Sequence, residues 1–404
     1  MRTHKAHFLA AVLLLAACSS ETSKGTITPG DTTIPPGSTA PGTSGGAVDT
    51  TLPDVWVQPA ETATLFFMES RGTYEAPDFV VSMLTLDGTR TDLWTENTGN
   101  GVTLLDASAD RSTLLLRHYE YDANSGQSTE TLSERDLASG TETVVTSMSE
   151  SFNARYVQDG TGDILLKHDV DHADNTGVIT STTEMLDRIG PDGALVVNIV
   201  TRETTDGGGS SFGWLQASVD GQPAIVVGGT PMMVIGPGGE QRGALGNDRS
   251  CQPVRQAGSG AIIASCGDVT EYITQLWLVP LDGSSPRQIT FADVDPSGID
   301  FGVWDVWTTA DGRQWVQRGG DCGAVWVEEL QADGTTTDAE ATGLIIGVSG
   351  TQLLTATNGM CEGGMTTISA YDSATGTSTD LLVPSSDDPD VMGVNAFEIL
   401  ALPR

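Results

Sequence analysis

A short turn recurs along this sequence at nearly even intervals, and this repeat limits the possible fold more than any other feature. Each turn follows an apolar, strand-like run and precedes a shorter one. The turns lie at Asp87-Gly88, Ser139-Gly140, Asp192-Gly193, Gly238-Gly239, Asp282-Gly283, Asp333-Gly334 and Thr375-Gly376. Because Asp-Gly and related pairs form tight hairpin turns, intervals of about 40–55 residues indicate a repeated unit of several short strands.

A second set of turns lies about twenty to thirty residues before members of the first. These turns are Ala109-Asp110, Asp159-Gly160, Asp220-Gly221, Ser259-Gly260, Asp311-Gly312 and Ser349-Gly350. Two hairpins per unit give four strands, which we name a to d in chain order. No segment shows the periodicity of an amphipathic helix, so the sequence predicts an all-β fold, a β-propeller of four-stranded blades.

The turns also predict the number of blades and how the ring closes. They favour seven blades, with six or eight as alternatives. The first unit begins with the apolar run 63–68, which fits a b strand and lacks an a strand before it. The run 394–400 near the C-terminus would supply that strand, closing the ring without a long open edge. An unrelated sandwich or a two-domain β protein is the alternative.

The repeat resembles a known kind of propeller. Residues 108–116 and the later run 135–140 resemble TolB-type (WD40-like) repeats, in which a Ser-Pro-Asp-Gly turn precedes an apolar strand and a later strand ends Asp-Leu-x-x-Gly. Here the proline is missing and the glycine is often replaced. The resemblance implies protein or peptide partners in envelope complexes. TolB also has an N-terminal α/β domain that this sequence lacks, so its specific partners are not carried over.

The N-terminus has the organisation of an export signal. Arg2 and Lys5 precede the apolar run 8–17, which is too short to span a bilayer. The run ends Leu-Ala-Ala-Cys, which resembles the lipobox of bacterial lipoproteins. That resemblance implies cleavage after residue 17 and lipid attachment to Cys18; an ordinary signal peptide with a chance cysteine is the alternative.

These features divide the chain into three parts. Residues 1–17 are the predicted lipoprotein signal peptide. Residues 18–58 are rich in Thr, Gly, Pro and Ser, and we expect a disordered tether because they have little to bury. Residues 59–404 form the predicted propeller domain. The expected location is the extracytoplasmic face of a bacterial membrane, inner or outer, reached through the lipid alone.

The formal net charge of -35 limits the possible partners. Such a surface repels nucleic acid and anionic lipid, so we exclude nucleic-acid binding. A solvated acidic surface is the simplest explanation of the charge, although it would also attract cations. We expect a monomer with a protein or peptide partner.

Five cysteines support export to an oxidising compartment. With Cys18 assigned to lipid, four remain, which predicts two disulfides. Cys251 opens strand a and Cys266 ends strand b of one blade, so we predict that they pair. Cys322 and Cys361 both end b strands and form the second predicted pair. Zinc is the alternative, but no Cys-x-x-Cys occurs and no His lies near these cysteines.

Function is expected on the loops that join strands b and c, which are longer and more polar than the tight turns. They include residues 70–78, 122–127, 169–177, 267–272, 319–322 and 358–364. The candidate binding residues in or beside these loops are acidic: Asp122, Asp169, Asp171, Asp174, Asp268, Asp321 and Glu362.

No cofactor and no catalytic residue are predicted. Asp169, Asp171 and Asp174 surround His172, but a calcium loop of the Asp-x-Asp-x-Asp-Gly kind would need Asp where Ala173 stands, so Ca²⁺ is only an alternative. His118 and His168 occupy matching places in neighbouring b strands. They could share a metal, but a position inherited from the repeat explains them better.

The leading hypothesis is a membrane-anchored, extracytoplasmic lipoprotein whose propeller is a non-enzymatic binding or interaction module. The alternative is a propeller hydrolase, lactonase- or glycosidase-like, that uses carboxylates or a metal in the central channel. The propeller of a peptidase is disfavoured because no hydrolase domain follows in the sequence.

Overall fold

The computed structural model describes residues 62–73, 76–96, 102–176, 178–204, 212–245, 250–258, 260–267, 274–291, 300–320, 325–357, 367–383, 391–394 and 400–403. The chain divides into two units, Met1–Asp49 and Thr50–Arg404, and every described residue belongs to the second. All regular elements among the described residues are β-strands. In this part of the chain no helix is long and apolar enough to cross a membrane.

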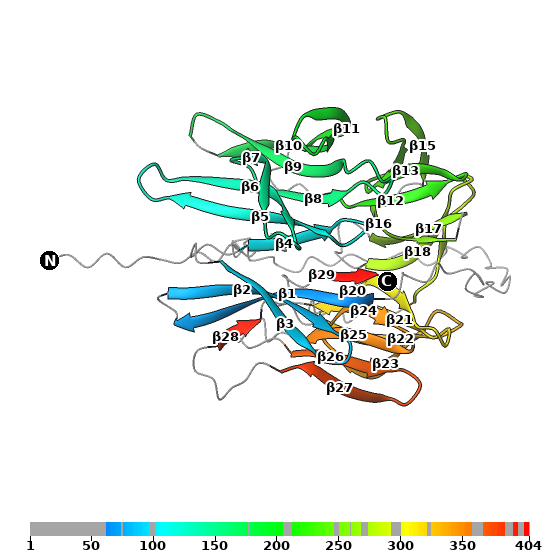
Figure 1. The fold of residues 1–404 in the computed structure, drawn as a ribbon. Coiled ribbons are helices and arrows are strands. Elements are labelled where there is room, and N and C mark those ends of the chain that lie inside the picture. Colours follow the sequence, from blue (N-terminus) through cyan, green and yellow to red (C-terminus); the bar gives the residue numbers. More distant parts are fainter. Residues whose placement is uncertain are drawn as a thin grey trace, which may run out of the picture. The chain divides into compact units, whose positions relative to one another are not determined.

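Four sheets each consist of four antiparallel strands in chain order (Figure 1). The first contains β4 (Val102–Ala107), β5 (Thr113–Asp122), β6 (Gln127–Asp136) and β7 (Glu142–Met148). The second contains β8 (Phe152–Tyr156), β9 (Ile164–Ala173), β10 (Ile179–Ile189) and β11 (Leu195–Thr204). The third contains β12 (Trp214–Val219), β13 (Gln222–Val227), β14 (Met232–Ile235) and β15 (Gln241–Leu245). The fourth contains β24 (Leu344–Ser349), β25 (Gln352–Thr357), β26 (Thr367–Asp372) and β27 (Thr377–Leu382).

The other strands form two larger sheets. An eight-stranded sheet contains β16 (Ser250–Ala257), β17 (Ala261–Gly267), β18 (Thr274–Pro280), β19 (Arg287–Gln288), β20 (Asp300–Thr308), β21 (Gln314–Gly320), β22 (Val325–Leu330) and β23 (Thr336–Thr342). A five-stranded sheet contains β1 (Thr62–Thr73), β2 (Ala76–Thr85), β3 (Arg90–Glu96), β28 (Val391–Val394) and β29 (Leu400–Pro403).

The strands lie where the repeat places them. The sequence predicts strands at 102–106, 113–121, 129–137 and 142–146, and β4 to β7 coincide with them to within two residues. The recurring turns join consecutive strands; Asp87-Gly88, for example, joins β2 to β3. An all-β propeller of four-stranded blades is therefore confirmed.

The Asp-Gly turns form because the aspartate bonds to the turn itself. In the β2–β3 turn, Asp87 Oδ1 accepts hydrogen bonds from the Thr89 backbone N–H (2.9 Å) and from Thr85 Oγ1 (2.5 Å). The Thr85 hydroxyl, followed by the Thr89 N–H, lowers the pKa of Asp87. Gly88 has φ +81°, a left-handed conformation that favours glycine.

One turn glycine also lets neighbouring sheets approach closely. A Cβ at Gly193, in the β10–β11 turn, would lie 2.2 Å from the carbonyl oxygen of Val145 in β7. Only a residue without a side chain fits there, so this turn packs directly on the outer strand of the preceding sheet.

The core lies between the sheets rather than within one of them. Leu115 and Leu132 of one sheet pack with Ile164 and Leu166 of the next, and all four are almost fully buried. Leu65 of β1 packs in the same way with Leu354 of β25, near the other end of the chain. Consecutive sheets, and the first and the last, thus share apolar cores.

The C-terminal strands complete the first blade, as the sequence predicts. β29 pairs with residues 62–66 of β1, and β28 pairs with residues 69–71 (Figure 1). The sequence predicts one strand at 394–400, whereas the described strands are 391–394 and 400–403, and residues 395–399 lie outside the described residues. Each of the two pairings contains an irregularity, between Ser70 and Arg71 opposite β28 and between Thr62 and Thr64 opposite β29.

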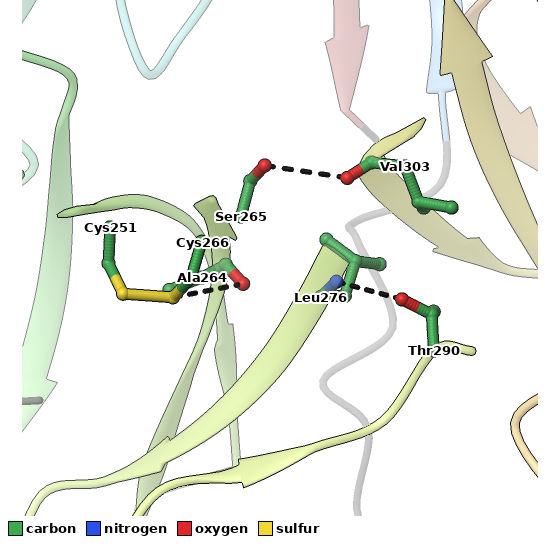
Figure 2. The surroundings of a disulfide bond; sticks show 7 residues. All are labelled: Cys251, Ala264, Ser265, Cys266, Leu276, Thr290 and Val303. Atoms are coloured by element: carbon green, nitrogen blue, oxygen red, sulfur yellow. Dashed lines mark hydrogen bonds between the residues drawn. A yellow bond between two sulfur atoms is a disulfide. The ribbon is translucent and has the colours of Figure 1, made fainter. Parts of the chain in front are cut away.

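The predicted disulfide between Cys251 and Cys266 is confirmed (Figure 2). The two residues lie directly opposite each other in the antiparallel pair β16–β17, and both are 3% exposed. Beside them, Ser265 Oγ donates to the Val303 carbonyl 3.4 Å away, which links β17 to β20. Cys322 and Cys361 lie outside the described residues, so their pairing stays a prediction.

Deleting residues 391–404 should destabilise the whole ring, because β1 loses both strands on one edge and its core is uncovered. We expect the melting temperature to fall by about 5 °C or more, measured by circular dichroism. Val383→Ala, at an exposed position shortly before the deletion, is the control and should melt within about a degree of the wild type. A truncated chain that melts like the control would contradict closure by these strands.

Candidate functional site

Two b–c hairpins extend beyond the buried part of their sheets, and they carry four of the candidate residues. We call residues 119–129 and 169–182 the outer hairpins; residue 177 lies outside the described residues. In β5 the burial changes abruptly, because residues 114–116 are fully buried and residues 119–122 are exposed. β9 shows the same change, from buried residues 164–167 to exposed residues 171–173.

Asp122 shapes the turn of the first outer hairpin. Its Oδ1 accepts the Asn124 N–H at 2.8 Å, and its Oδ2 accepts the Ser125 hydroxyl at 2.8 Å. These bonds, with the Asn124 N–H first, lower the pKa of Asp122 and keep it charged. In this structure Asp122 is a turn residue, and a role in binding stays a prediction.

Asp174 does the same in the second outer hairpin. Its Oδ1 accepts the Thr176 N–H (2.7 Å), the Thr176 hydroxyl (2.6 Å) and the Val178 N–H (3.1 Å). These bonds close the β9–β10 turn.

Asp169 and Asp171 correct the expected loop boundaries. The sequence places both in a loop over 169–177, whereas both lie in β9, which runs to Ala173. Asp171 Oδ1 accepts the Thr182 hydroxyl of β10 at 2.7 Å. The expected loop over 70–78 is likewise mostly strand, since β1 ends at residue 73 and β2 starts at residue 76. Most residues of these two expected loops therefore lie in paired strands.

The described acidic candidates of the first outer hairpin do not lie together with those of the second. Side chains alternate along a strand, so Asp122 points to the side of Leu114, which packs against β1 and β2. Asp169 and Asp171 point to the side of Leu165, which packs against β12–β15. Asp268, Asp321 and Glu362 lie outside the described residues.

On the sides where the two outer hairpins face each other, the residues differ from the acidic candidates. Tyr119 and Tyr121 alternate with Leu115 and therefore point toward β8 and β9. Val170 and His172 alternate with Leu166 and point back toward β5 and β6. Tyr119 is 36% exposed and Tyr121 is 56% exposed, so two aromatic rings meet solvent on this side.

Buried ion pairs anchor the base of each outer hairpin to the next sheet. At the first base, Glu130 Oε2 accepts the backbone N–H of Phe152 (3.3 Å), and Arg117 donates to the Phe152 carbonyl (2.6 Å). Arg117 Nη1 lies 3.8 Å from Glu130 Oε2, and its guanidinium lies over the Phe152 ring. Glu130 and Arg117 together thus hold Phe152, the first residue of β8.

The same arrangement recurs one blade later. Glu184 Oε1 accepts the Phe212 N–H at 3.3 Å, and Lys167 Nζ lies 3.7 Å from both Glu184 Oε1 and Asp169 Oδ1. The Lys167 ammonium lies 4.8 Å from the centre of the Phe212 ring. Burial raises the pKa of Glu184, whose side chain is only 2% exposed.

The first blade uses a related network at residue 69. Glu69 accepts hydrogen bonds from Arg71 (2.8 Å) and from two nitrogens of Arg90 (2.5 and 2.7 Å), and both arginines also bond Asp92. Burial raises the pKa of Glu69 despite these partners.

Sequence reasoning missed these anchors, although the repeat carried a signal. Arg117 and Lys167 precede the matched histidines in neighbouring b strands, and each is followed in strand c by a glutamate, Glu130 or Glu184. A buried acid and base at the same place in two repeats would have marked an inter-blade contact.

His118 and His168 do not share a site, because each pairs inside its own blade. His118 Nε2 lies 2.6 Å from Glu142 Oε1 and 3.1 Å from Ser133 Oγ. His168 Nε2 lies 3.0 Å from Asp187 Oδ2. Across the described ranges, no group of three or more His, Cys, Asp or Glu side chains is placed to hold a metal ion.

The comparisons with known proteins give a fold and no family. No model of a protein family and no curated protein matches this sequence. Pyrococcus horikoshii acylaminoacyl peptidase is similar in structure, with a TM-score of 0.52 and 12% identity over 81% of this chain and 52% of that chain.

A second solved structure matches over nearly its whole length. The β-propeller domain of the trilobed protease from Pyrococcus furiosus has a TM-score of 0.50 and 12% identity over 83% of this chain and 97% of that one. This chain spans about half the length of the acylaminoacyl peptidase it matches. At 12% identity these similarities show the β-propeller fold alone.

The His118–Glu142 pair should make stability depend on pH. Burial alone would lower the pKa of His118, but the hydrogen bond and charge of Glu142 outweigh it and raise that pKa above 6.5. Burial alone would raise the pKa of Glu142, but hydrogen bonds from His118 and Ser133 lower it from 4.5 to about 2. The stability contributed by the Glu142 carboxylate is complete above pH 4.5 and is lost as the pH falls toward 2. The stability contributed by the His118 imidazolium is complete below pH 6.5 and is lost as the pH rises.

His118→Gln should therefore lower the free energy of unfolding most between pH 4.5 and 6.5. We expect a loss of about 1 kcal/mol in the free energy of unfolding there, since the pair is only partly buried, and less at pH 8 or pH 3. Urea unfolding of both proteins at the three pH values measures this. A difference that does not change with pH would contradict the ion pair.

Proposed function

We propose that this protein is a membrane-anchored, extracytoplasmic lipoprotein whose propeller is a non-enzymatic binding module. The observation that carries the proposal is the pair of outer hairpins. They extend beyond the buried sheets, their bases are fixed by buried ion pairs, and they expose aromatic and apolar side chains. Val178, for example, is 60% exposed in the second hairpin.

Exposed aromatic residues on a firmly held scaffold are typical of binding surfaces. Tyrosine supplies a large contact area with few rotatable bonds and is enriched where interfaces gain most of their energy. Four of the nine large exposed hydrophobic residues in the described part of the chain lie in the two outer hairpins. They are Tyr119, Tyr121, Val178 and Ile179. This concentration supports a partner that engages those hairpins.

The ring that holds this surface is proposed to have seven blades. The eight-stranded sheet is joined at its middle only by the parallel pairing of Thr274 with Gly302, so we count β16–β19 and β20–β23 as two blades. Seven apolar clusters among the described residues support this count, because each joins two consecutive groups of four strands and the last returns to β1. The TolB-type resemblance rests on the repeat alone and adds no partner.

A role alongside a hydrolase is the second candidate, which the structural similarity favours. One of the two structures named above is the β-propeller domain of a protease, and the other is a peptidase that this chain matches over about half of its length. A propeller of that kind would present or select a polypeptide for cleavage, which also requires polypeptide binding. Both candidates therefore predict a partner at the outer hairpins.

Lipid attachment at Cys18 would place this surface at a membrane. Cys18→Ser in the full chain should move the protein from the membrane pellet to the soluble fraction of a bacterial host and abolish metabolic labelling with palmitate. Cys251→Ser, which removes a cysteine of the disulfide, is the matched control and should keep the label. A Cys18→Ser protein that stays labelled would refute the assignment.

Binding at the outer hairpins can be mapped by crosslinking in cells. A photo-crosslinking amino acid in place of Tyr121 should capture a discrete partner, because that position is exposed on the proposed surface. The same amino acid in place of Leu195, which is 62% exposed beside the β10–β11 turn at the other end of its sheet, should not capture it. Equal capture from both positions, or none from either, would overturn the proposed surface.

A further inference from the structure

A cavity of about 490 Å³ lies between strands β21–β23 and the β24–β27 sheet. Strand β23 contributes Asp338 and Ala339 to its lining, and residues 373–376 of the β26–β27 turn form another part. Arg313, directly before β21, and Glu329 of β22 also line it. A cavity of this size falls within the range of small-molecule sites, so it is a candidate for a ligand.

The corresponding place is closed by backbone in other blades. There the turn between strands c and d packs on the outer strand of the preceding sheet. A Cβ at Gly193 would lie 2.2 Å from the carbonyl oxygen of Val145 in β7, and one at Gly239 would lie 3.0 Å from that of Asn198 in β11. Between the β26–β27 turn and β23 the same place holds the cavity instead. The repeat is therefore modified here in a way that makes room for a ligand.

The walls of the cavity are fixed by contacts within and between the sheets. Arg313 Nε and Nη2 donate to the two carboxylate oxygens of Glu329, at 2.8 and 2.5 Å, and Nη1 donates to the Ser373 carbonyl in the neighbouring sheet. The Arg313 guanidinium lies 4.8 Å from the centre of the Trp315 ring, and Trp315 meets Tyr371 edge-to-face at 5.6 Å. Polar groups held in place before a ligand arrives lower the entropy cost of binding.

The charges around the cavity favour a neutral ligand. Arg313 disfavours a cation, whereas Asp338 and the net charge of -35 disfavour an anion. The side chains of Arg313 and Glu329 are 37% and 25% exposed, so an apolar ligand would remove water from an ion pair without replacing its hydrogen bonds.

The same ion pair offers a donor and an acceptor side by side. Its bonds to Glu329 and Ser373 engage three of the five N–H groups of Arg313, and each Glu329 oxygen accepts one of them. Within the described residues, donors on the guanidinium and lone pairs on the carboxylate therefore remain for a ligand. Adjacent hydroxyl groups of a sugar ring match this pattern, because each can both donate and accept.

We propose that this cavity binds a neutral saccharide unit, either a free sugar or one ring of a longer chain. One hydroxyl group of the ring accepts a hydrogen bond from Arg313, and its neighbour donates one to Glu329. Recognition rests on hydrogen bonds, because Trp315 and Tyr371 are only 1% and 6% exposed and are too covered to stack on a sugar face. The site goes beyond the proposed function, since c–d turns lie at the opposite end of the strands from the b–c hairpins.

The test uses the full chain in a detergent without a sugar headgroup, which would compete for the cavity. Saturation-transfer NMR measures binding of glucose, galactose, N-acetylglucosamine, cellobiose and chitobiose. We expect at least one of them to bind with a dissociation constant of about 1 mM or lower. Its uronic acid should bind at least about ten-fold more weakly because of the negative charge. Tighter binding of a disaccharide than of its monosaccharide indicates one ring of a chain, and equal binding indicates a free sugar.

A matched pair of variants locates the site. Ala374→Trp should fill the cavity and weaken binding at least about ten-fold, because Ala374 is an exposed residue of the lining. Ala138→Trp is the control, since exposed Ala138 holds the same place in the β6–β7 turn. In both turns the starting aspartate, Asp136 or Asp372, accepts the N–H of the turn glycine, at 2.9 and 2.8 Å. Both variants should melt within about two degrees of the wild type, because both positions are exposed.

A photoreactive derivative of the sugar that binds locates the site without any substitution. It should label residues 373–376 or their neighbours in the lining, identified by mass spectrometry of the digested protein. Equal affinities of Ala374→Trp and Ala138→Trp, labelling elsewhere in the chain, or no binding of any of the five sugars would overturn the proposal. Binding of lysinamide, tested alongside, in the absence of sugar binding would show a site for cations and also overturn it.

Discussion

No sheet of this protein buries both of its faces without the sheet before it and the sheet after it. Leu115 in β5 needs Ile164 of the next sheet, while its neighbours Leu114 and Leu116 need Phe66 and Met68 of the previous one. Each blade is therefore unstable alone, and stability comes from interfaces that run around the molecule. The first blade depends on β28 and β29, which arrive from the far end of the chain.

This dependence explains why charged residues are buried at the hairpin bases. The apolar cores end near residues 116 and 166, and beyond them a backbone N–H at the start of the next sheet needs an acceptor. Glu130 and Glu184 supply it, and Arg117 and Lys167 offset the charge. Burying an ion is costly, so such groups contribute less to net stability than to fixing one arrangement of the sheets. They set the direction in which the hairpins leave the ring.

The sequence predicted those parts of the fold where local chemistry decides the structure. An Asp-Gly pair forms the same turn in any blade, so the turns, and with them the strands between, lay where the repeat put them. Cys251 and Cys266 were found because strand assignment alone places them opposite each other. The turn at Asp122 was also predicted at the correct position. Its hydrogen bonds with Asn124 and Ser125 give the carboxylate a structural role.

The errors arose where a strand has no buried face. Residues 169–173 alternate without an apolar side, so their pattern is that of a loop, and only the pairing of β9 with β10 shows that they form a strand. The sequence also could not show which acidic side chains share one side of a hairpin. That assignment requires knowing which sheet packs on each side.

The same absence of a buried face gives the outer hairpins their functional interest. A ribbon that covers no core adds exposed surface without adding stability of its own, and exposed apolar surface is a hazard that proteins normally keep small. Here two neighbouring blades extend such ribbons, hold them with buried ion pairs and place Tyr119 and Tyr121 on the side facing the next blade. Exposed aromatic side chains on ribbons that cover no core are best explained by a partner that covers them.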